Sequence, residues 1–395
     1  MRDRNLSRLI RPAVLSCLVL LAPAALSAPR TAALKEAWRA GGEDDEILFG
    51  SVGGVTVDTE GHVLVLDSQL SQVHVYGADG THLSTLGREG DGPGEVRRPG
   101  GMFVRPSGDV ALVQGFPGRI VLVHADGTPA GESSYTPPGG PAAGQFAVIV
   151  RAFGQGEGMV LAGIRMTFGG GSQSKQTYFL AECDANGAEQ HVLLQKEHTV
   201  DYADFRLDEG AMDFVWQRLA VGPDGRVYVA PERGAYAIRV FGPDGAEQRV
   251  LTRDYTAPAR DARQQAIARK VIEAVGANYP APLKGVTIED TEAAVAGLFP
   301  ANDGSLWVAT GRSGVDVPAG CWIVLDRFGA DGAFAGQVAL PGAHDPDKDA
   351  LFILPDNRVV VVTGALDAWL NQQAVGAESA AEEAEPLEVI CYTME

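Results

Sequence analysis

One pattern recurs six times along this chain of 395 residues, and it constrains the fold more than any other feature. In the clearest copy, from Gly54 to Leu86, valines alternate with other residues in three short stretches. Alternation with a period of two is typical of half-buried strands. The tripeptides at 59–61 and 78–80 each end in glycine, which adopts a positive φ at little cost and so favours tight turns. Each copy therefore predicts one antiparallel sheet of four strands.

The second and fourth copies follow this pattern closely, whereas the third, fifth and sixth copies follow it loosely. Length alone would favour two or three domains, but a closed ring of repeats holds this many residues in one domain. The sequence therefore predicts a single domain at 28–395. Its sheets, or blades, are predicted at about 51–87, 98–131, 146–195, 213–253, 298–340 and 350–393.

The sixth copy contains only three strands, and the missing strand is predicted at the other end of the chain. Residues 34–42 are similar to the segment at 83–90 that closes the first copy, and both precede an acidic, glycine-containing loop. Pairing of 34–40 with the sixth blade would close the ring and remove the open edges of a linear array. The predicted fold is an all-β, six-bladed β-propeller of four-stranded antiparallel blades, closed by an N-terminal strand that joins the C-terminal blade.

The sharpest copies share a motif of alternating valines around Asp58 and Gly61 that ends at the turn Asp79-Gly80, and with this motif they resemble NHL repeats. The connector at 87–99 is also similar to the linker between repeats of that group. The resemblance covers nearly the whole predicted domain and implies a six-bladed propeller of bacterial type. It implies little about chemistry, because function is grafted onto such folds in their loops. The residues that carry it are Gly54-Val-x-Val-Asp58-x-x-Gly61-x-Val-x-Val-x-Asp67, then Val73-x-Val-Tyr76 and Asp79-Gly80.

The first 27 residues predict a signal peptide. Four arginines precede an apolar run from Ala13 to Leu26, which is short for a bilayer span, and Ala25 and Ser27 suit a signal-peptidase site. The sequence thus predicts a periplasmic or extracellular protein without stable membrane insertion after cleavage. Lipid anchoring through Cys17 is the less favoured alternative, because Arg11 and Pro12 lie just upstream and leave almost no apolar stretch before this cysteine. The arginines are Arg2, Arg4, Arg8 and Arg11.

The chain is strongly acidic, with a formal net charge of −19. The predicted signal peptide holds four arginines and one aspartate, so its removal changes this charge to −22. Such a charge repels phosphate backbones and anionic lipids, which argues against nucleic acid as a partner. Three cysteines remain at 183, 321 and 391, all in apolar strand-like runs that predict buried thiols. A bridge between Cys321 and Cys391 stays open as an alternative.

The loops that are longer than the repeat requires are all predicted on one face of the ring. Tight turns join strands one to two and three to four on the face that we call the trim face. Loops between strands two and three, and the crossovers between blades, lie on the opposite, elaborated face. Function concentrates in loops, so we expect binding there, although insertions that are merely tolerated are the alternative. The loops are 88–98, 114–119, 165–175, 254–297, 311–320 and 364–386.

Within the longest insertion, residues 260–277 carry apolar side chains at helical spacing. This pattern predicts one amphipathic helix between blades four and five. The acidic tract at 378–385 predicts a solvated loop rather than a calcium site, which would need regularly spaced oxygen ligands.

Candidate ligand-binding residues lie on the predicted elaborated face. Arginine suits bidentate contacts with carboxylates or phosphates, although pairing with nearby acidic residues such as Glu95 is the favoured alternative. Asp67 is expected chiefly to accept backbone hydrogen bonds in the adjoining loop. The candidates are Asp67, Arg88, Arg98, Gln114, Arg119, Arg165, Arg233, Tyr236 and Arg312.

No catalytic residue, metal ligand or cofactor is predicted. His62, His74 and His82 fall in one blade but match no zinc spacing, and no nucleophile elbow or nucleotide-binding loop occurs. The favoured function is a monomeric binding scaffold for a protein, peptide or saccharide. The alternative is a metal-assisted lyase or a lactonase-type enzyme. Converging acidic, asparagine or histidine side chains at the mouth of the central channel would favour that alternative.

Overall fold

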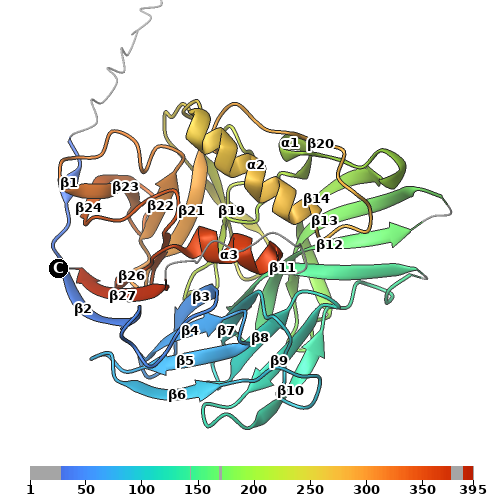
Figure 1. The fold of residues 1–395 in the computed structure, drawn as a ribbon, viewed down its shortest axis with the longest axis horizontal. Helices are drawn as coiled ribbons and strands as arrows, with labels where there is room; N and C mark the ends of the chain where they lie inside the picture. The colour runs from blue at the N-terminus through green and yellow to red at the C-terminus, as the bar shows by residue number, and fades with distance from the viewer. Residues whose placement is uncertain (1–27, 143, 169–170, 375–385, 395) are drawn as a thin grey trace, which may run out of the picture.

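The computed structural model describes residues 28–142, 144–168, 171–374 and 386–394, and they form a ring of six antiparallel blades (Figure 1). The predicted fold class is therefore confirmed. The predicted signal peptide and the acidic tract at 378–385 lie outside the described residues. In the ranges that are described, no helix is both long and apolar enough to cross a membrane.

Blades 1 to 5 each contain four strands in chain order from the channel outward, and blade 6 contributes three strands of its own. Blade 1 contains β3 (Val52–Val57), β4 (Val63–Asp67), β5 (Gln72–Tyr76) and β6 (His82–Leu86), and blade 2 contains β7 (Gly101–Val104), β8 (Val110–Gln114), β9 (Arg119–Val123) and β10 (Pro129–Ser134). Blade 3 contains β11 (Gln145–Gln155), β12 (Gly158–Phe168), β13 (Gln173–Cys183) and β14 (Glu189–Asp201), and blade 4 contains β16 (Leu219–Val221), β17 (Val227–Val229), β18 (Ala237–Phe241) and β19 (Glu247–Thr252). Blade 5 contains β21 (Val295–Pro300), β22 (Leu306–Thr310), β23 (Cys321–Phe328) and β24 (Phe334–Pro341), and blade 6 contains β25 (Ala350–Ile353), β26 (Val359–Val362) and β27 (Glu388–Met394).

The ring is closed by the N-terminal segment, as predicted. Strand β2 (Leu34–Gly41) pairs antiparallel with β27 and becomes the outer strand of blade 6, and the two lie side by side in Figure 1. Just before it, β1 (Arg30–Thr31) pairs in parallel with β24 of blade 5, which the sequence pattern did not predict. The first described residues therefore link two neighbouring blades. Their pairing covers edges that would otherwise expose unpaired backbone groups.

The hydrophobic core is divided among the six interfaces between neighbouring blades. In β4, Val63 and Val65 pack toward blade 6, whereas Leu64 and Leu66 pack toward blade 2. Successive side chains of a strand point to opposite faces, so a strand between two neighbours buries both sets. All four of these side chains are at most 1% exposed. Each blade is therefore stabilised by both of its neighbours, and closure completes the last interface.

Helix α2 (Ala262–Gly276) confirms the helix predicted at 260–277. Asp261 and Gln264 form a capping box at its first turn, in which each side chain binds the other residue's backbone N–H. A further helix, α3 (Ala365–Ala374), follows β26 in a segment that was predicted only as a loop. The remaining elements of the elaborated face are η1 (Tyr202–Asp204), β15 (Arg206–Asp208), α1 (Glu209–Met212) and β20 (Gly285–Thr287).

The prediction of a loop at 165–175 is wrong for most of that segment. Strand β12 continues to Phe168 and β13 begins at Gln173, so most of that segment is paired strand. Arg165 lies opposite Thr177, and Thr167 lies opposite Lys175. Glycine and serine in the sequence masked this extension, because their strand propensity is low. Blade 3 therefore has strands of 11 to 13 residues, longer than those of the other blades.

Helices α2 and α3 together span the elaborated face. The C-terminal part of α2 packs on blade 3, where Ile272 lies against Val200 and Phe205. Helix α3 starts from blade 6, which is opposite blade 3 in a ring of six. The helices contact each other, and the Asn278 side chain donates to Gln373 Oε1 at 2.9 Å. Figure 1 shows α3 crossing the middle of the ring with α2 beside it, so this face is bridged by helices.

Ring closure has a measurable consequence at Trp38. This residue of β2 is 7% exposed, and its ring stacks on Tyr76 of blade 1 with centroids 5.1 Å apart. Trp38→Ala is expected to lower the free energy of unfolding by about 3–5 kcal/mol, because it opens a cavity at the closing interface. Denaturant unfolding of the purified variant measures this change.

Lys35→Ala on the same strand is the control, since Lys35 is exposed and its loss should change stability by less than about 0.5 kcal/mol. Equal stabilities for the two variants would contradict closure through β2.

Candidate functional site

A row of aromatic side chains follows the elaborated face from blade 2 to blade 3. Phe116 lies in the loop after β8, Phe146 begins β11, Phe168 ends β12, and Tyr202 follows β14. Neighbouring ring centroids are 5.6, 5.6 and 6.0 Å apart along this order. Strands one and three descend from this face and strands two and four return to it, so these strand ends meet there. We call these four residues the aromatic row.

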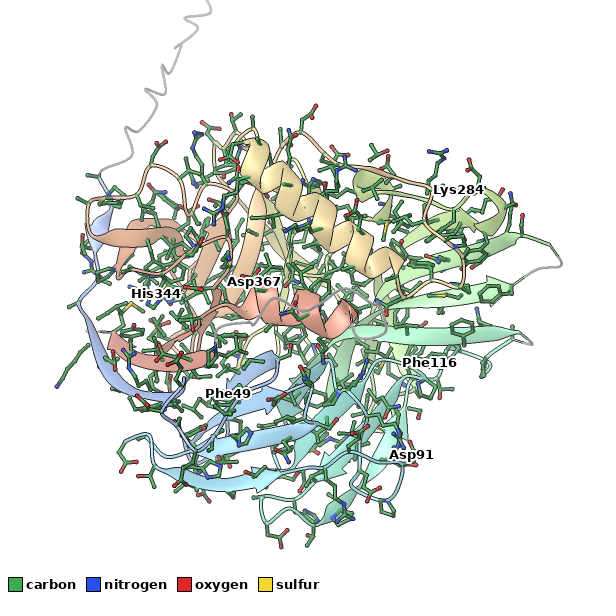
Figure 2. The ribbon with its side chains drawn as sticks, viewed as in Figure 1. Phe49, Asp91, Phe116, Lys284, His344 and Asp367 are labelled. Carbon is green, nitrogen blue, oxygen red and sulfur yellow. The ribbon has the colours of Figure 1, made fainter. Side chains whose placement is uncertain are left out.

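The row is exposed at one end and packed at the other. Phe116 is 62% exposed and Phe168 is 42% exposed. Tyr202 contacts Phe205 and Tyr279, which belong to the cluster beneath α2. A shallow hollow of about 540 Å³ lies beside Tyr279, between the C-terminal end of α2 and residues 279–283. Figure 2 labels Phe116 beside the strands of blade 3, well away from Asp367 on α3.

Two predicted site residues hold the loop that carries Phe116. The Gln114 side chain donates to the carbonyl oxygen of Phe116 and accepts from the backbone N–H of Arg97. Arg119 donates to Glu132 at 2.8 Å and to the carbonyl oxygen of Gly92. Gln114 and Arg119 therefore tie the crossover at 88–98 to the Phe116 loop.

The arginines of that crossover differ in their partners. Arg88 pairs with Glu95 at 2.8 Å, and Arg97 pairs with Asp91 at 2.8 Å, as the alternative in the sequence analysis proposed. The Arg97 guanidinium holds the pKa of the Asp91 carboxyl below its usual value. Arg98 is exposed, its backbone N–H donates to Ser71, and its guanidinium forms no ion pair with any residue that the structure describes. Arg98 is thus a cation available to a ligand.

Two other predicted site residues, Asp67 and Tyr236, are buried in structural contacts. Asp67 is fully buried and accepts the backbone N–H groups of Gly50, Gln69 and Leu70, as expected for a residue that shapes its loop. The Tyr236 hydroxyl donates to Asp326 at 2.8 Å, and burial raises the tyrosine pKa well above its usual value.

Arg165 lies over the Phe179 ring and contacts Glu189 at 3.5 Å. Arg312, in contrast, is half-exposed and lies 3.8 Å from Asp316.

A partly buried ion network around Glu209 was not predicted from the sequence. Arg260 binds both oxygens of Glu209, at 2.7 and 2.9 Å, and also pairs with Glu292 at 2.8 Å. The predicted site residue Arg233 lies 3.2 Å from Glu209 and donates to the Thr291 carbonyl oxygen. Although burial alone would raise the Glu209 pKa, its bonds to Arg260 lower it below the usual value. The network thus joins α1 to both ends of the insertion that carries α2.

The histidines of blade 1 serve packing rather than a shared site. His74 is buried between Phe49 and His82, and burial lowers its pKa. His62 lies in a turn of the trim face beside Asp58. Among the residues in the described ranges, no group of three histidine, cysteine, aspartate or glutamate side chains is arranged to hold a metal ion. The enzyme alternative therefore stays a prediction.

The three cysteines in the described part of the chain are free thiols, which removes the alternative of a bridge between Cys321 and Cys391. Cys183 and Cys391 are buried as predicted, and burial raises the pKa of Cys391 to about 11. Cys321 is only half-buried, so the prediction that its thiol is buried is wrong.

Comparison with solved structures gives one match that supports the fold, and two weaker likenesses. No family model matches the chain, and no curated protein matches it. A member of the DUF4221 family from Bacteroides vulgatus has 11% identity and a TM-score of 0.51, and the match covers 93% of this chain and 99% of that one. A candidate exported protein from Bacteroides fragilis has 9% identity and a TM-score of 0.44, with coverages of 92% and 95%. A virginiamycin B lyase from Staphylococcus aureus has 11% identity and a TM-score of 0.37, with coverages of 85% and 78%.

The ion network around Glu209 makes a prediction for stability. Glu209→Gln leaves Arg233 and part of Arg260 without their carboxylate. We expect a loss of about 2 kcal/mol, less than the roughly 3–5 kcal/mol for fully buried pairs, because these side chains are partly exposed and Glu292 remains. The Glu209 pKa is lowered on folding, so its contribution is complete well above the usual glutamate pKa of about 4.3 and disappears as the pH falls through the folded-state pKa.

Denaturant unfolding at several pH values tests this dependence. The difference between the parent protein and Glu209→Gln should shrink as the pH falls. Arg263→Gln removes an exposed pair with Asp345 and should cost less than about 1 kcal/mol. A Glu209→Gln effect that is equally small would contradict the role of the network.

Proposed function

We propose that this chain is an exported, NHL-like propeller that binds a polypeptide partner along the aromatic row of its elaborated face. Export rests on the predicted signal peptide, and the NHL-like character rests on the repeat motif. The binding role rests on one structural observation, the aromatic row, in which Phe116 and Phe168 are exposed and the half-buried Phe146 lies between them. Large apolar side chains gathered on a surface mark interaction sites.

Exposed apolar side chains are unevenly distributed over the described residues. Four of the seven large ones lie on loops or strand ends of the elaborated face, and the other three lie on the outermost strands of separate blades. Leu70 lies next to Ser71, which accepts from Arg98, and Gln114 connects this crossover to Phe116. These hydrogen bonds therefore link the loops that carry Leu70, Arg98 and Phe116 on the elaborated face. The seven are Leu48, Leu70, Phe116 and Phe168, and then Leu83, Val192 and Val250.

The orientation of the rings favours a polypeptide over a saccharide. Phe168 is stacked between Phe146 and Tyr202, at interplanar angles of 18° and 14°. Aromatic neighbours therefore flank the ring on both sides and leave less of its faces open to a ligand. A sugar ring needs a free aromatic face to stack on, whereas apolar and aromatic side chains of a peptide also pack against ring edges. Phe116 at the free end is the natural anchor, since aromatic residues dominate binding energy at protein interfaces.

The peptide-binding proposal is tested by selection from a displayed library of random twelve-residue peptides, with a glycan array as the competing probe. We expect the selection to enrich peptides with aromatic or large aliphatic residues. Phe116→Ser should weaken their binding at least tenfold, which corresponds to about 1.4 kcal/mol, because the exposed anchor is lost.

Leu83→Ser is the matched control, because Leu83 is 49% exposed on the outer strand of blade 1 and should leave binding unchanged. Selective binding to glycans, or peptides equally sensitive to both substitutions, would overturn the proposal.

A further inference from the structure

A second hollow, of about 330 Å³, opens on the trim face. Its lining comes from the first turns of four consecutive blades, at 57–59, 104–106, 154–156 and 222–225. These turns connect the strand nearest the channel to the next strand in each blade, so the hollow lies at the trim-face end of the channel. We call it the trim-face hollow. Its size is at the lower end of the range for small-molecule sites, about 300–1,000 Å³.

Arg105 is the one cationic side chain that lines this hollow among the described residues. Its Nη2 donates to the carbonyl oxygen of Ala185 at 2.8 Å, which fixes the guanidinium against blade 3. Its Nε is buried and has no acceptor in the described chain. A buried donor without a partner is costly, and more so on a charged group. Arg105 therefore brings a cation without an ion-pair partner among the described residues to the wall of the hollow, although the Asp109 carboxylate is near enough to feel its charge, and its buried Nε has no acceptor.

The arginine has no carboxylate of its own, unlike others on the trim face. Arg226, in the first turn of blade 4, pairs with Asp224 at 2.8 Å, and Arg358 in blade 6 pairs with Asp356. Arg105 forms no ion pair within the part of the chain that the structure describes. Asp109 is in the same turn, but its carboxylate binds Ser107 and His124 instead.

The remaining lining is mixed. Val57, Val104, Pro106 and Pro223 supply apolar walls. Asp58 is the acidic group, and its oxygens already accept from the backbone of Glu60 and from the His62 ring. The Gln155 amide is bound to Glu182 and to the carbonyl oxygen of Gly225. A guanidinium above apolar walls recognises a carboxylate that carries a small apolar group.

We propose that the trim-face hollow binds a small organic monocarboxylate, with Arg105 holding its carboxylate and the valine and proline walls holding its apolar part. A monoanion suits the site better than phosphate or sulfate. Asp58 lines the same hollow and the whole chain carries a charge of −19, so each additional negative charge on the ligand is repelled. This site is separate from the aromatic row, because the two lie on opposite faces of the ring.

Ligand-detected NMR on the purified protein tests the proposal with benzoate, phenylacetate and hexanoate, each compared with its neutral amide, and with inorganic phosphate. At least one carboxylate should bind with a Kd that is tenfold or more below those of its amide and of phosphate. Arg105→Gln should weaken that binding at least tenfold, and Arg105→Lys should restore part of it, because the charge returns without the planar fork.

Two further variants keep the test decisive. Thr59→Trp fills the hollow from an exposed position and leaves Arg105 in place, so it should abolish binding even if Arg105→Gln folds poorly. Arg226→Gln removes a neighbouring paired arginine and should leave the Kd unchanged. The proposal is overturned if no carboxylate of the panel binds, if amides or phosphate bind equally well, or if Thr59→Trp has no effect. The carboxylate test does not depend on the aromatic row, so a failure of the peptide-binding proposal would not change its outcome.

Discussion

The pairing of β2 with β27 is the contact on which the rest of the structure depends. Every blade buries both faces of its inner strands against its neighbours, so a six-membered ring needs all six interfaces. The interface between blades 6 and 1 is completed by Trp38 and Ala40, which come from the start of the described chain. Because β1 first pairs with blade 5, the N-terminal segment fastens two blades in succession. Closure therefore joins residues separated by nearly the whole sequence.

A closed ring also explains why the two faces differ. The turns of the trim face are short because they join adjacent strands of one sheet, and they leave only the hollow at the channel end. The elaborated face receives the crossovers, whose lengths the ring does not restrict. One crossover carries α2, the loop between the second and third strands of blade 6 carries α3, and the two segments meet through Asn278 and Gln373. The helices bridge the face near its centre, whereas the aromatic row lies at its edge over blades 2 and 3.

Much of the fold could be predicted because its signals are local and periodic. Alternating valines predicted the strands, and the glycine turns predicted the short connections of the trim face. The strand-like segment at 34–40, which belongs to none of the six copies, predicted the closure of the ring. Helix α3 was missed because its segment adjoins an acidic tract that is typical of loops. The aromatic row was missed for a different reason. Phe116, Phe146, Phe168 and Tyr202 are far apart in sequence, and only the strand directions of two blades bring their rings together. The ion network of Glu209 and Arg260 likewise depends on contacts across 51 positions.

The arginines show most clearly what the sequence can and cannot reveal. An acidic chain offers each guanidinium many carboxylates, so pairing is the expected outcome, and Arg88, Arg119, Arg233 and Arg260 are all paired. The informative residues are those that the fold keeps from a carboxylate in spite of this excess. Arg98 is held at a positive φ on the elaborated face, and Arg105 is fixed by a carbonyl oxygen on the trim face. The two arginines are close in the sequence, but the ring separates them onto opposite faces. The cost of leaving a partly buried cation unpaired is recovered only when a ligand supplies the missing anion. Arg105 meets that condition better than Arg98, because a cavity surrounds it.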